Sequence, residues 1–136
     1  MENSAHRIPA IFHMEGLCGA FIQDSTSFPS GIGRGASFDP KLEEQIAEIV
    51  SRQETACGIT HILAPVLDVA RDPRMGRFGE SYGEDASLVS AMGAAYTKGI
   101  QKNTVASRKA ESVAKHFVAF HNSQGGIHGT HSETPT

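Results

Sequence analysis

The chain has few of the features that mark membrane, secreted or nucleic-acid-binding proteins. It contains two cysteines among 136 residues, too few for a disulfide framework, so both are expected to be reduced. No apolar run approaches the roughly 20 residues that a membrane span needs. The formal net charge of -3 gives no electrostatic reason to expect nucleic acid or an anionic membrane as a partner. Residues 1–7 have no apolar core after a basic start, so no signal peptide is visible.

What remains is the composition of an ordinary globular domain. Hydrophobic residues make up 39% and charged residues 20% of the chain, which is typical of a soluble fold with a packed core. A length of 136 residues suits one domain. We find no internal repeat and no low-complexity segment.

Three short apolar segments predict buried strands, at residues 8–13, 59–69 and 113–118. They begin about one strand–helix–strand unit apart. The order strand, helix, strand, helix, strand predicts an α/β fold with a parallel sheet and right-handed crossovers. An open doubly wound sheet and part of an eight-stranded barrel both fit this order.

The two intervening helices have recognisable ends. Asp39 can cap the first helix, and Pro40 suits its first turn because the missing N–H has no intrahelical partner there. Gly58 ends that helix, since glycine takes a left-handed cap without steric cost. Asp85 can cap the second helix, which begins at Ala86. Residues 15–38 and 102–111 are expected to be loops.

The segment at residues 71–85 is densely charged, with three arginines and four carboxylates in fifteen residues. No helix or strand pattern fits it, yet its alternating charges favour order, because each arginine has carboxylates within reach. One arginine is expected to bind ligand oxygens with its planar fork. The others are expected to form ion pairs that support the loop, with Asp72, Glu80, Glu84 and Asp85.

Polar residues follow each predicted strand, which points to a site at the carboxyl edge of the sheet. Glu15 follows the first strand and either accepts hydrogen bonds from a ligand or pairs with a neighbouring cation. Lys115 and His116 interrupt the third apolar segment. Either both reach a pocket through irregular backbone, since adjacent strand residues point to opposite faces, or the lysine snorkels and the histidine lies in the core.

Two other patterns carry little weight. The histidines His116, His121, His128 and His131 lack the cysteine partners of common zinc motifs, so we expect no metal site and no cofactor. The glycines at positions 31, 33 and 35 lack the Gly-Lys-Ser/Thr of a phosphate loop.

Five motifs together resemble the N-terminal catalytic domain of family 3 glycoside hydrolases, the β-glucosidase and β-xylosidase group. They occur in the family's order and cover residues 7 to about 126: IPAIFHMEGL (8–17), SFP (27–29), APVLDVARDPRMGR (64–77), ESYGED (80–85) and AKHF (114–117). The resemblance implies a partial (β/α)8 barrel of the TIM type, of which residues 1–136 are a fragment incomplete at both ends. It implies a β-linked oligosaccharide or glycoside as substrate.

The resemblance also implies roles for four residues in binding the sugar at the cleavage subsite. Arg77 matches an arginine that binds its hydroxyls, and Glu15 falls where the family has a carboxylate that holds its far hydroxyls. Lys115 and His116 match a hydroxyl-binding pair, often with unusual peptide geometry. Three positions depart from the family: Cys18 stands where histidine is common, Ala86 where proline is common, and residues 124–128 lack a further arginine.

Retaining hydrolysis needs two carboxyl groups, a nucleophile and an acid, and the resemblance places both beyond residue 136. The fragment is therefore expected to be inactive alone, and a non-catalytic carbohydrate-binding remnant is the alternative function. Related β-N-acetylglucosaminidases carry Pro-Gly-His after the Lys-His-Phe element, where this chain has VAFH at residues 118–121, which argues against that activity. A partial barrel would leave sheet edges open, so self-association is expected.

Overall fold

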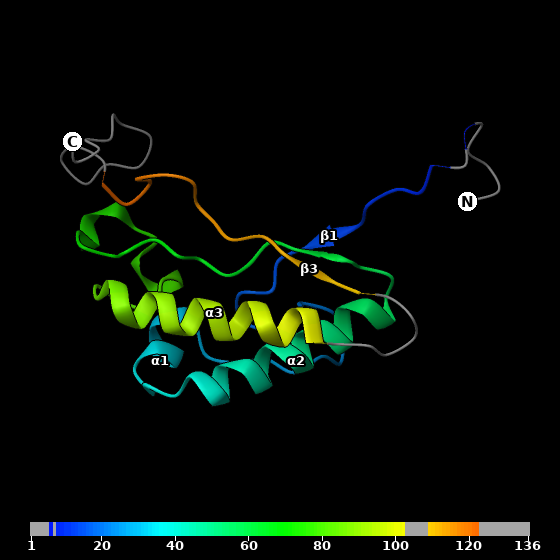
Figure 1. The fold of residues 1–136 in the computed structure, drawn as a ribbon, viewed down its shortest axis with the longest axis horizontal. Coiled ribbons are helices and arrows are strands. Elements are labelled where there is room, and N and C mark those ends of the chain that lie inside the picture. Colours follow the sequence, from blue (N-terminus) through cyan, green and yellow to red (C-terminus); the bar gives the residue numbers. More distant parts are fainter. Residues whose placement is uncertain (1–5, 7, 103–108, 123–136) are drawn as a thin grey trace.

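The computed structural model describes residue 6, residues 8–102 and residues 109–122. A small sheet lies over two long helices (Figure 1). The regular elements follow one another as β1 (His13–Met14), α1 (Gly31–Gly35), α2 (Pro40–Ala56), β2 (His61–Ile62), the 3₁₀ helices η1 (Pro73–Met75) and η2 (Phe78–Glu80), α3 (Ala86–Lys102) and β3 (Glu111–Ser112).

The three strands form a parallel sheet in the order β1-β2-β3, which confirms the predicted α/β class. His13 pairs with His61, and His61 pairs with Glu111. Hydrogen bonds continue the pairing of the last two strands beyond their regular parts, because Lys115 N donates to Pro65 O at 3.0 Å and Leu67 N donates to Lys115 O at 2.6 Å. The carboxyl ends of all three strands thus meet at one edge.

The regular strands are shorter than predicted, and the first one is less buried. Ile8 and Ile11 are 70% exposed and Phe12 is 63% exposed, because their segment runs away from the helices (Figure 1) and no described layer covers it. The second apolar segment is interrupted at Pro65, whose missing N–H cannot join a ladder. The third segment contains cis peptide bonds at Lys115–His116 and Phe117–Val118.

Both long helices begin where predicted. Asp39 Oδ1 accepts hydrogen bonds from the backbone of Lys41 and Leu42 at 3.0 and 3.1 Å, and Asp85 Oδ1 accepts one from Leu88 N at 2.8 Å. The helices pack against each other and against the sheet. Their shared core consists of buried apolar side chains and one buried tyrosine: Ile46, Ala47, Val50, Ile62, Ala64, Tyr96, Ile100 and Ala110.

A buried ion pair ties the loop of residues 15–38 to α2, where the sequence had indicated only a loop. Arg34, in α1, donates from Nε to Glu43 Oε2 at 2.8 Å, and its Nη1 donates to the carbonyl of Leu17 at 2.6 Å. Tyr82 donates its hydroxyl to Glu43 Oε1 at 2.6 Å. Glu43 therefore joins α1, α2 and the charged segment at residues 71–85.

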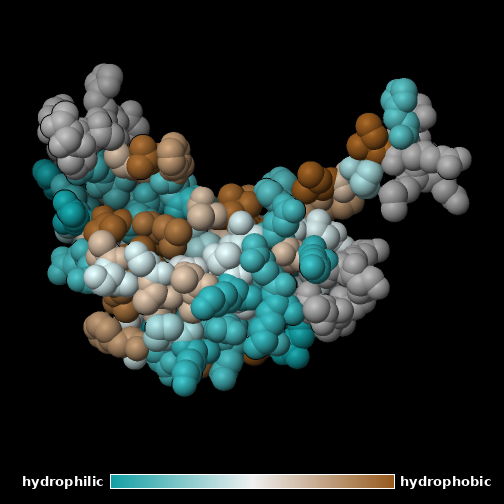
Figure 2. Space-filling view, in the orientation of Figure 1, coloured by the Kyte–Doolittle hydropathy of each residue, from teal (hydrophilic) through white to brown (hydrophobic). Residues whose placement is uncertain are grey.

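Hydrophilic residues cover much of the helix layer, while hydrophobic residues are exposed along the N-terminal segment (Figure 2). Within residues 8–102 and 109–122, no helix combines the length and apolar character that crossing a membrane would require.

Candidate functional site

Six charged or titratable side chains gather at the carboxyl edge of the sheet as three pairs. Glu15 directly follows β1, and Asp68 comes from the segment after β2. The remaining members come from the segment after β3 and from the charged loop: Lys115, His116, Arg77 and Glu80. The four residues that the sequence singled out thus approach one another, and each has one acidic or basic partner.

Lys115 is held by Glu15. Its ammonium group donates to Oε1 at 3.0 Å and to Oε2 at 2.7 Å. The lysine side chain is 15% exposed and the glutamate side chain 44% exposed, so the pair lies at the border between core and solvent. Glu15 was expected either to accept hydrogen bonds from a ligand or to pair with a neighbouring cation, and in this structure it pairs with Lys115. The ammonium has a third donor and the carboxylate has solvent-facing lone pairs, so both can still bind a hydroxyl-bearing ligand.

His116 is held by Asp68. The ring Nδ1 lies 2.7 Å from Asp68 Oδ2, and the backbone N–H of His116 donates to the same oxygen at 3.3 Å. The Asp68 side chain is almost fully buried, whereas the imidazole is partly exposed. The imidazole of His116 is therefore partly exposed and rests on a buried carboxylate, so His116 is not a core histidine.

Arg77 is held by Glu80 in a bidentate pair. Nε and Nη2 of the guanidinium each lie 2.7 Å from a carboxylate oxygen of Glu80, and this hydrogen-bonded guanidinium lowers the pKa of Glu80. The Nη1 group has no hydrogen-bond partner among the described residues and is available to a ligand. The guanidinium also lies over the ring of Phe120, 5.4 Å from its centroid, and that ring is 4.4 Å from the imidazole of His116.

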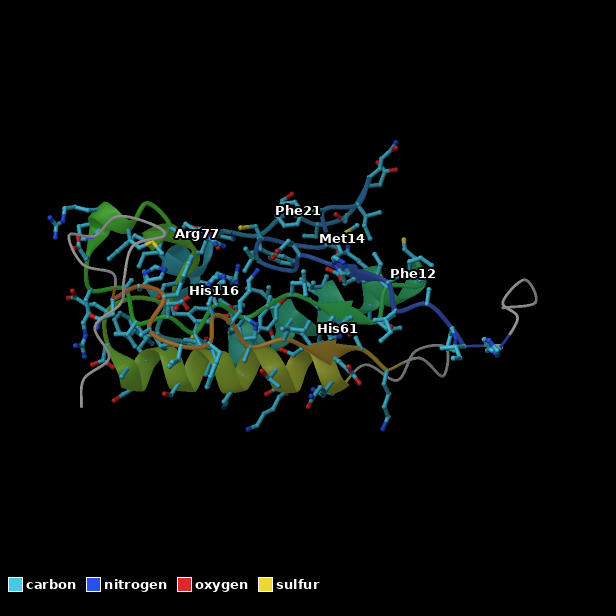
Figure 3. All side chains as sticks on the ribbon, turned by 90° about the horizontal axis from the view of Figure 1, so that it is seen from above. Phe12, Met14, Phe21, His61, Arg77 and His116 are labelled. Atoms are coloured by element: carbon cyan, nitrogen blue, oxygen red, sulfur yellow. The ribbon has the colours of Figure 1, made fainter. Side chains whose placement is uncertain are left out.

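Arg77 and His116 lie at the same end of the molecule, away from Phe12 and His61 (Figure 3). Charge–charge interactions connect the three pairs, since Glu15 and Asp68 both act on the guanidinium of Arg77, and Lys115 acts on Glu80. The alternating cations and anions make a surface rich in both hydrogen-bond donors and acceptors.

The charged loop is closed at its base by Ser81. Its hydroxyl donates to the carbonyl of Asp68 and accepts from Gly83 N at 3.2 Å, while Ala70 N donates to Gly83 O at 3.0 Å. On the outside of the loop, α1 packs so closely that a Cβ atom at Gly31 would clash with the carbonyl oxygen of Glu80. These contacts hold the segment that carries Arg77.

The predicted supporting ion pairs are present only in part. Asp72 pairs with Arg74 at 2.7 Å on the exposed side of the loop, as expected, whereas Glu80 pairs with Arg77, the arginine that was expected to bind the ligand. Asp85 serves instead as the cap of α3. Arg71 lines a neighbouring pocket of about 430 Å³, together with Asp68, His116 and His121.

Sequence reasoning missed three neighbours of the predicted residues: Asp68, Phe120 and His121. Asp68 carries a visible signal, because it is a carboxylate near the end of the second apolar segment, at the same sheet edge as the others. His121 lies 3.9 Å from Asp68 Oδ2, and burial lowers the pKa of its imidazole. Within the described ranges no group of three side chains is arranged to hold a metal ion, and His128 and His131 lie outside those ranges.

Comparisons with known proteins give one consistent result. The family model for the glycosyl hydrolase family 3 N-terminal domain matches residues 1–136. A β-xylosidase of Formosa agariphila is 35% identical over 135 residues, which cover 93% of this chain and 19% of that protein. A periplasmic β-glucosidase of Salmonella typhimurium is 32% identical over 127 residues, covering 93% of this chain and 16% of the relative.

A solved structure agrees with these relatives. A mutant β-glucosidase from Listeria innocua, in complex with laminaribiose, superposes with a TM-score of 0.86 at 32% identity, covering 95% of this chain and 18% of that one. The three-stranded parallel sheet with its helices is consistent with part of a TIM-like barrel. The chain spans less than a fifth of the length of each of these relatives. On the match of the whole chain to the family model, this protein belongs to glycosyl hydrolase family 3, within the N-terminal domain.

Proposed function

We propose that this chain forms part of the sugar-binding subsite of a family 3 glycoside hydrolase acting on terminal β-D-glucosides or β-D-xylosides. The observation that carries the proposal is the gathering of Glu15, Arg77, Lys115 and His116 at one edge of the sheet, each held by an oppositely charged or titratable partner. Residues 1–136 would then be one part of the barrel domain.

The chemistry of the cluster suits a sugar. Each sugar hydroxyl both donates and accepts a hydrogen bond, and the cluster offers free donors on Arg77 and Lys115 beside acceptors on Glu15. The pairs fix these side chains before a ligand arrives, which lowers the entropy cost of binding. Phe120 beneath Arg77 and His116 adds an apolar support.

Hydrolysis requires more than this cluster contains. A retaining glycosidase needs one carboxylate free to attack the anomeric carbon and one carboxylic acid with a raised pKa. In the cluster, Glu15, Asp68 and Glu80 each face a cation or an imidazole, and the pKa of Glu80 is lowered by Arg77. We infer that the nucleophile and the acid lie outside residues 1–136, so the chain alone should not turn over aryl β-glucosides or aryl β-xylosides.

Titration of the 136-residue chain with glucose and with xylose tests the binding role. We expect weak binding that is lost in Arg77→Ala, because the Nη1 group that the Glu80 pair leaves free is then no longer there to donate to the hydroxyls. Arg74→Ala is the matched control, since Arg74 lies in the same loop but pairs with Asp72 on the exposed side. Equal effects of the two substitutions would contradict the proposal, and turnover by the rigorously purified chain would contradict the inferred position of the catalytic carboxylates.

A further inference from the structure

We propose that Asp68 is a positioning residue that holds the imidazole of His116 with a proton on Nδ1, so that in the neutral ring Nε2 is left free as an acceptor for a sugar hydroxyl. The use of Nε2 by a sugar rests on the function proposed above, whereas the proton on Nδ1 rests on the geometry around Asp68. The four residues matched to sugar-binding positions do not include Asp68.

One oxygen of Asp68 serves two groups of the same residue. Oδ2 lies 2.7 Å from Nδ1 of His116 and accepts the backbone N–H of His116 at 3.3 Å. A backbone N–H can only donate and an ionised carboxylate can only accept, so Oδ2 is the acceptor in both contacts. An acceptor at 2.7 Å from Nδ1 requires that Nδ1 carry the proton, and in a neutral imidazole the remaining nitrogen, Nε2, then has a free lone pair.

The surroundings hold Asp68 in this role. Its side chain is 3% exposed, and its own carbonyl accepts the hydroxyl of Ser81, which closes the charged loop. Two fixed contacts to the ring and backbone of His116 leave the imidazole little freedom to rotate. A carboxylate that orients a histidine in this way is a common means of setting which ring nitrogen faces a ligand.

The neighbouring His121 does not compete for the same oxygen. Its Nε2 lies 3.9 Å from Asp68 Oδ2, beyond hydrogen-bond distance, and neither ring nitrogen has a hydrogen-bond partner among the described residues. Of the two histidines beside Asp68, His116 is therefore the one that Asp68 orients.

Nitrogen-15 NMR of the histidine rings in the full chain tests the assignment directly. In the unsubstituted chain we expect neutral His116 to show a protonated Nδ1 and an unprotonated Nε2. Asp68→Ala should abolish this preference and weaken glucose binding about tenfold. Asp72→Ala, which removes a carboxylate of the same loop that pairs with Arg74 instead, should change neither result.

The NMR measurement tests the positioning of His116 by Asp68, and the binding measurement tests the proposed function. A proton on Nε2 of neutral His116 in the unsubstituted chain would overturn the role of Asp68, and this result needs no variant to fold. If neutral His116 kept its proton on Nδ1 in a folded Asp68→Ala chain, that result would also overturn the role of Asp68. If the expected pattern is found but the chain binds no glucose or xylose, the proposed function fails while the positioning of His116 by Asp68 stands.

Discussion

At the scale of single residues, Glu54 shows how a buried charge makes stability depend on pH. Its side chain is fully buried, and neither carboxyl oxygen has a hydrogen-bond partner among the described residues. Burial, with a smaller effect of Glu15, raises the pKa of Glu54 to about 8. The pKa of a glutamate in the unfolded chain is about 4.5. The folded chain therefore keeps a proton between these values that the unfolded chain loses.

This difference fixes the sign of the pH dependence. Stability linked to Glu54 is fully present below about pH 4.5 and is lost as the pH rises to about 8, by up to about 1.4 kcal/mol per pH unit. Glu54→Gln, which stays neutral, should flatten the fall in the free energy of unfolding over that window. Urea unfolding at a series of pH values measures it. Glu84→Gln, at an exposed position, is the control, and an equally steep fall in Glu54→Gln would refute the assignment.

The residues of the candidate site differ in how far the sequence could predict them. Lys115 and His116 stood out because polar side chains interrupt an apolar segment, and the structure places them beside Glu15 and Asp68. The partnership of His116 with Asp68 could not be predicted from spacing. The two partners lie 48 residues apart in the sequence, and strand periodicity would send the side chains of Lys115 and His116 to opposite faces.

At the scale of elements, Glu43 links α2 to α1 and to the charged loop at residues 71–85. It is 1% exposed and binds Arg34 of α1 and Tyr82 of the charged loop. Glu43→Ala would leave the guanidinium of Arg34 buried without its anion, which typically costs about 3–5 kcal/mol. Because Tyr82 would lose its acceptor too, the loop that carries Arg77 should loosen.

Thermal and urea unfolding of Glu43→Ala measure this effect. The matched control is Glu44→Ala, one position along α2, where the glutamate is half-buried and, within the described part of the chain, pairs with the exposed Lys102 at 3.4 Å. That substitution should have a small effect, since exposed ion pairs contribute little. Similar losses of stability in the two variants would show that the buried network does not hold these elements together.

The helices were predictable from sequence and the strands only roughly so. Asp39, Pro40 and Asp85 are strong local signals, and both helices begin beside them. The strands lack such signals, because their lengths depend on pairing between segments that are far apart in sequence. Apolar residues at positions 8–12 indicated burial, but burial also requires a neighbouring layer, and no described element covers Ile8 or Ile11.

At the scale of the whole molecule, the open edges of the sheet lead to a prediction about association. β1 and β3 are the outer strands, and Phe12 beside β1 is 63% exposed. Exposed apolar side chains at a strand edge favour pairing between copies. We expect sedimentation to show concentration-dependent self-association that Phe12→Glu reduces. Phe38→Glu, at a phenylalanine that is 73% exposed in the loop before α2, should not. A sharp thermal transition of a monomer at all concentrations would argue against this.

We propose that residues from three strand ends and the charged loop form one sugar-binding surface. Amide chemical-shift mapping of the 136-residue chain during titration with glucose tests this proposal. We expect saturable shifts centred on Glu15, Arg77, Lys115 and His116, with the outer faces of α2 and α3 unaffected. Saturable shifts centred elsewhere, or none in a demonstrably folded chain, would contradict it.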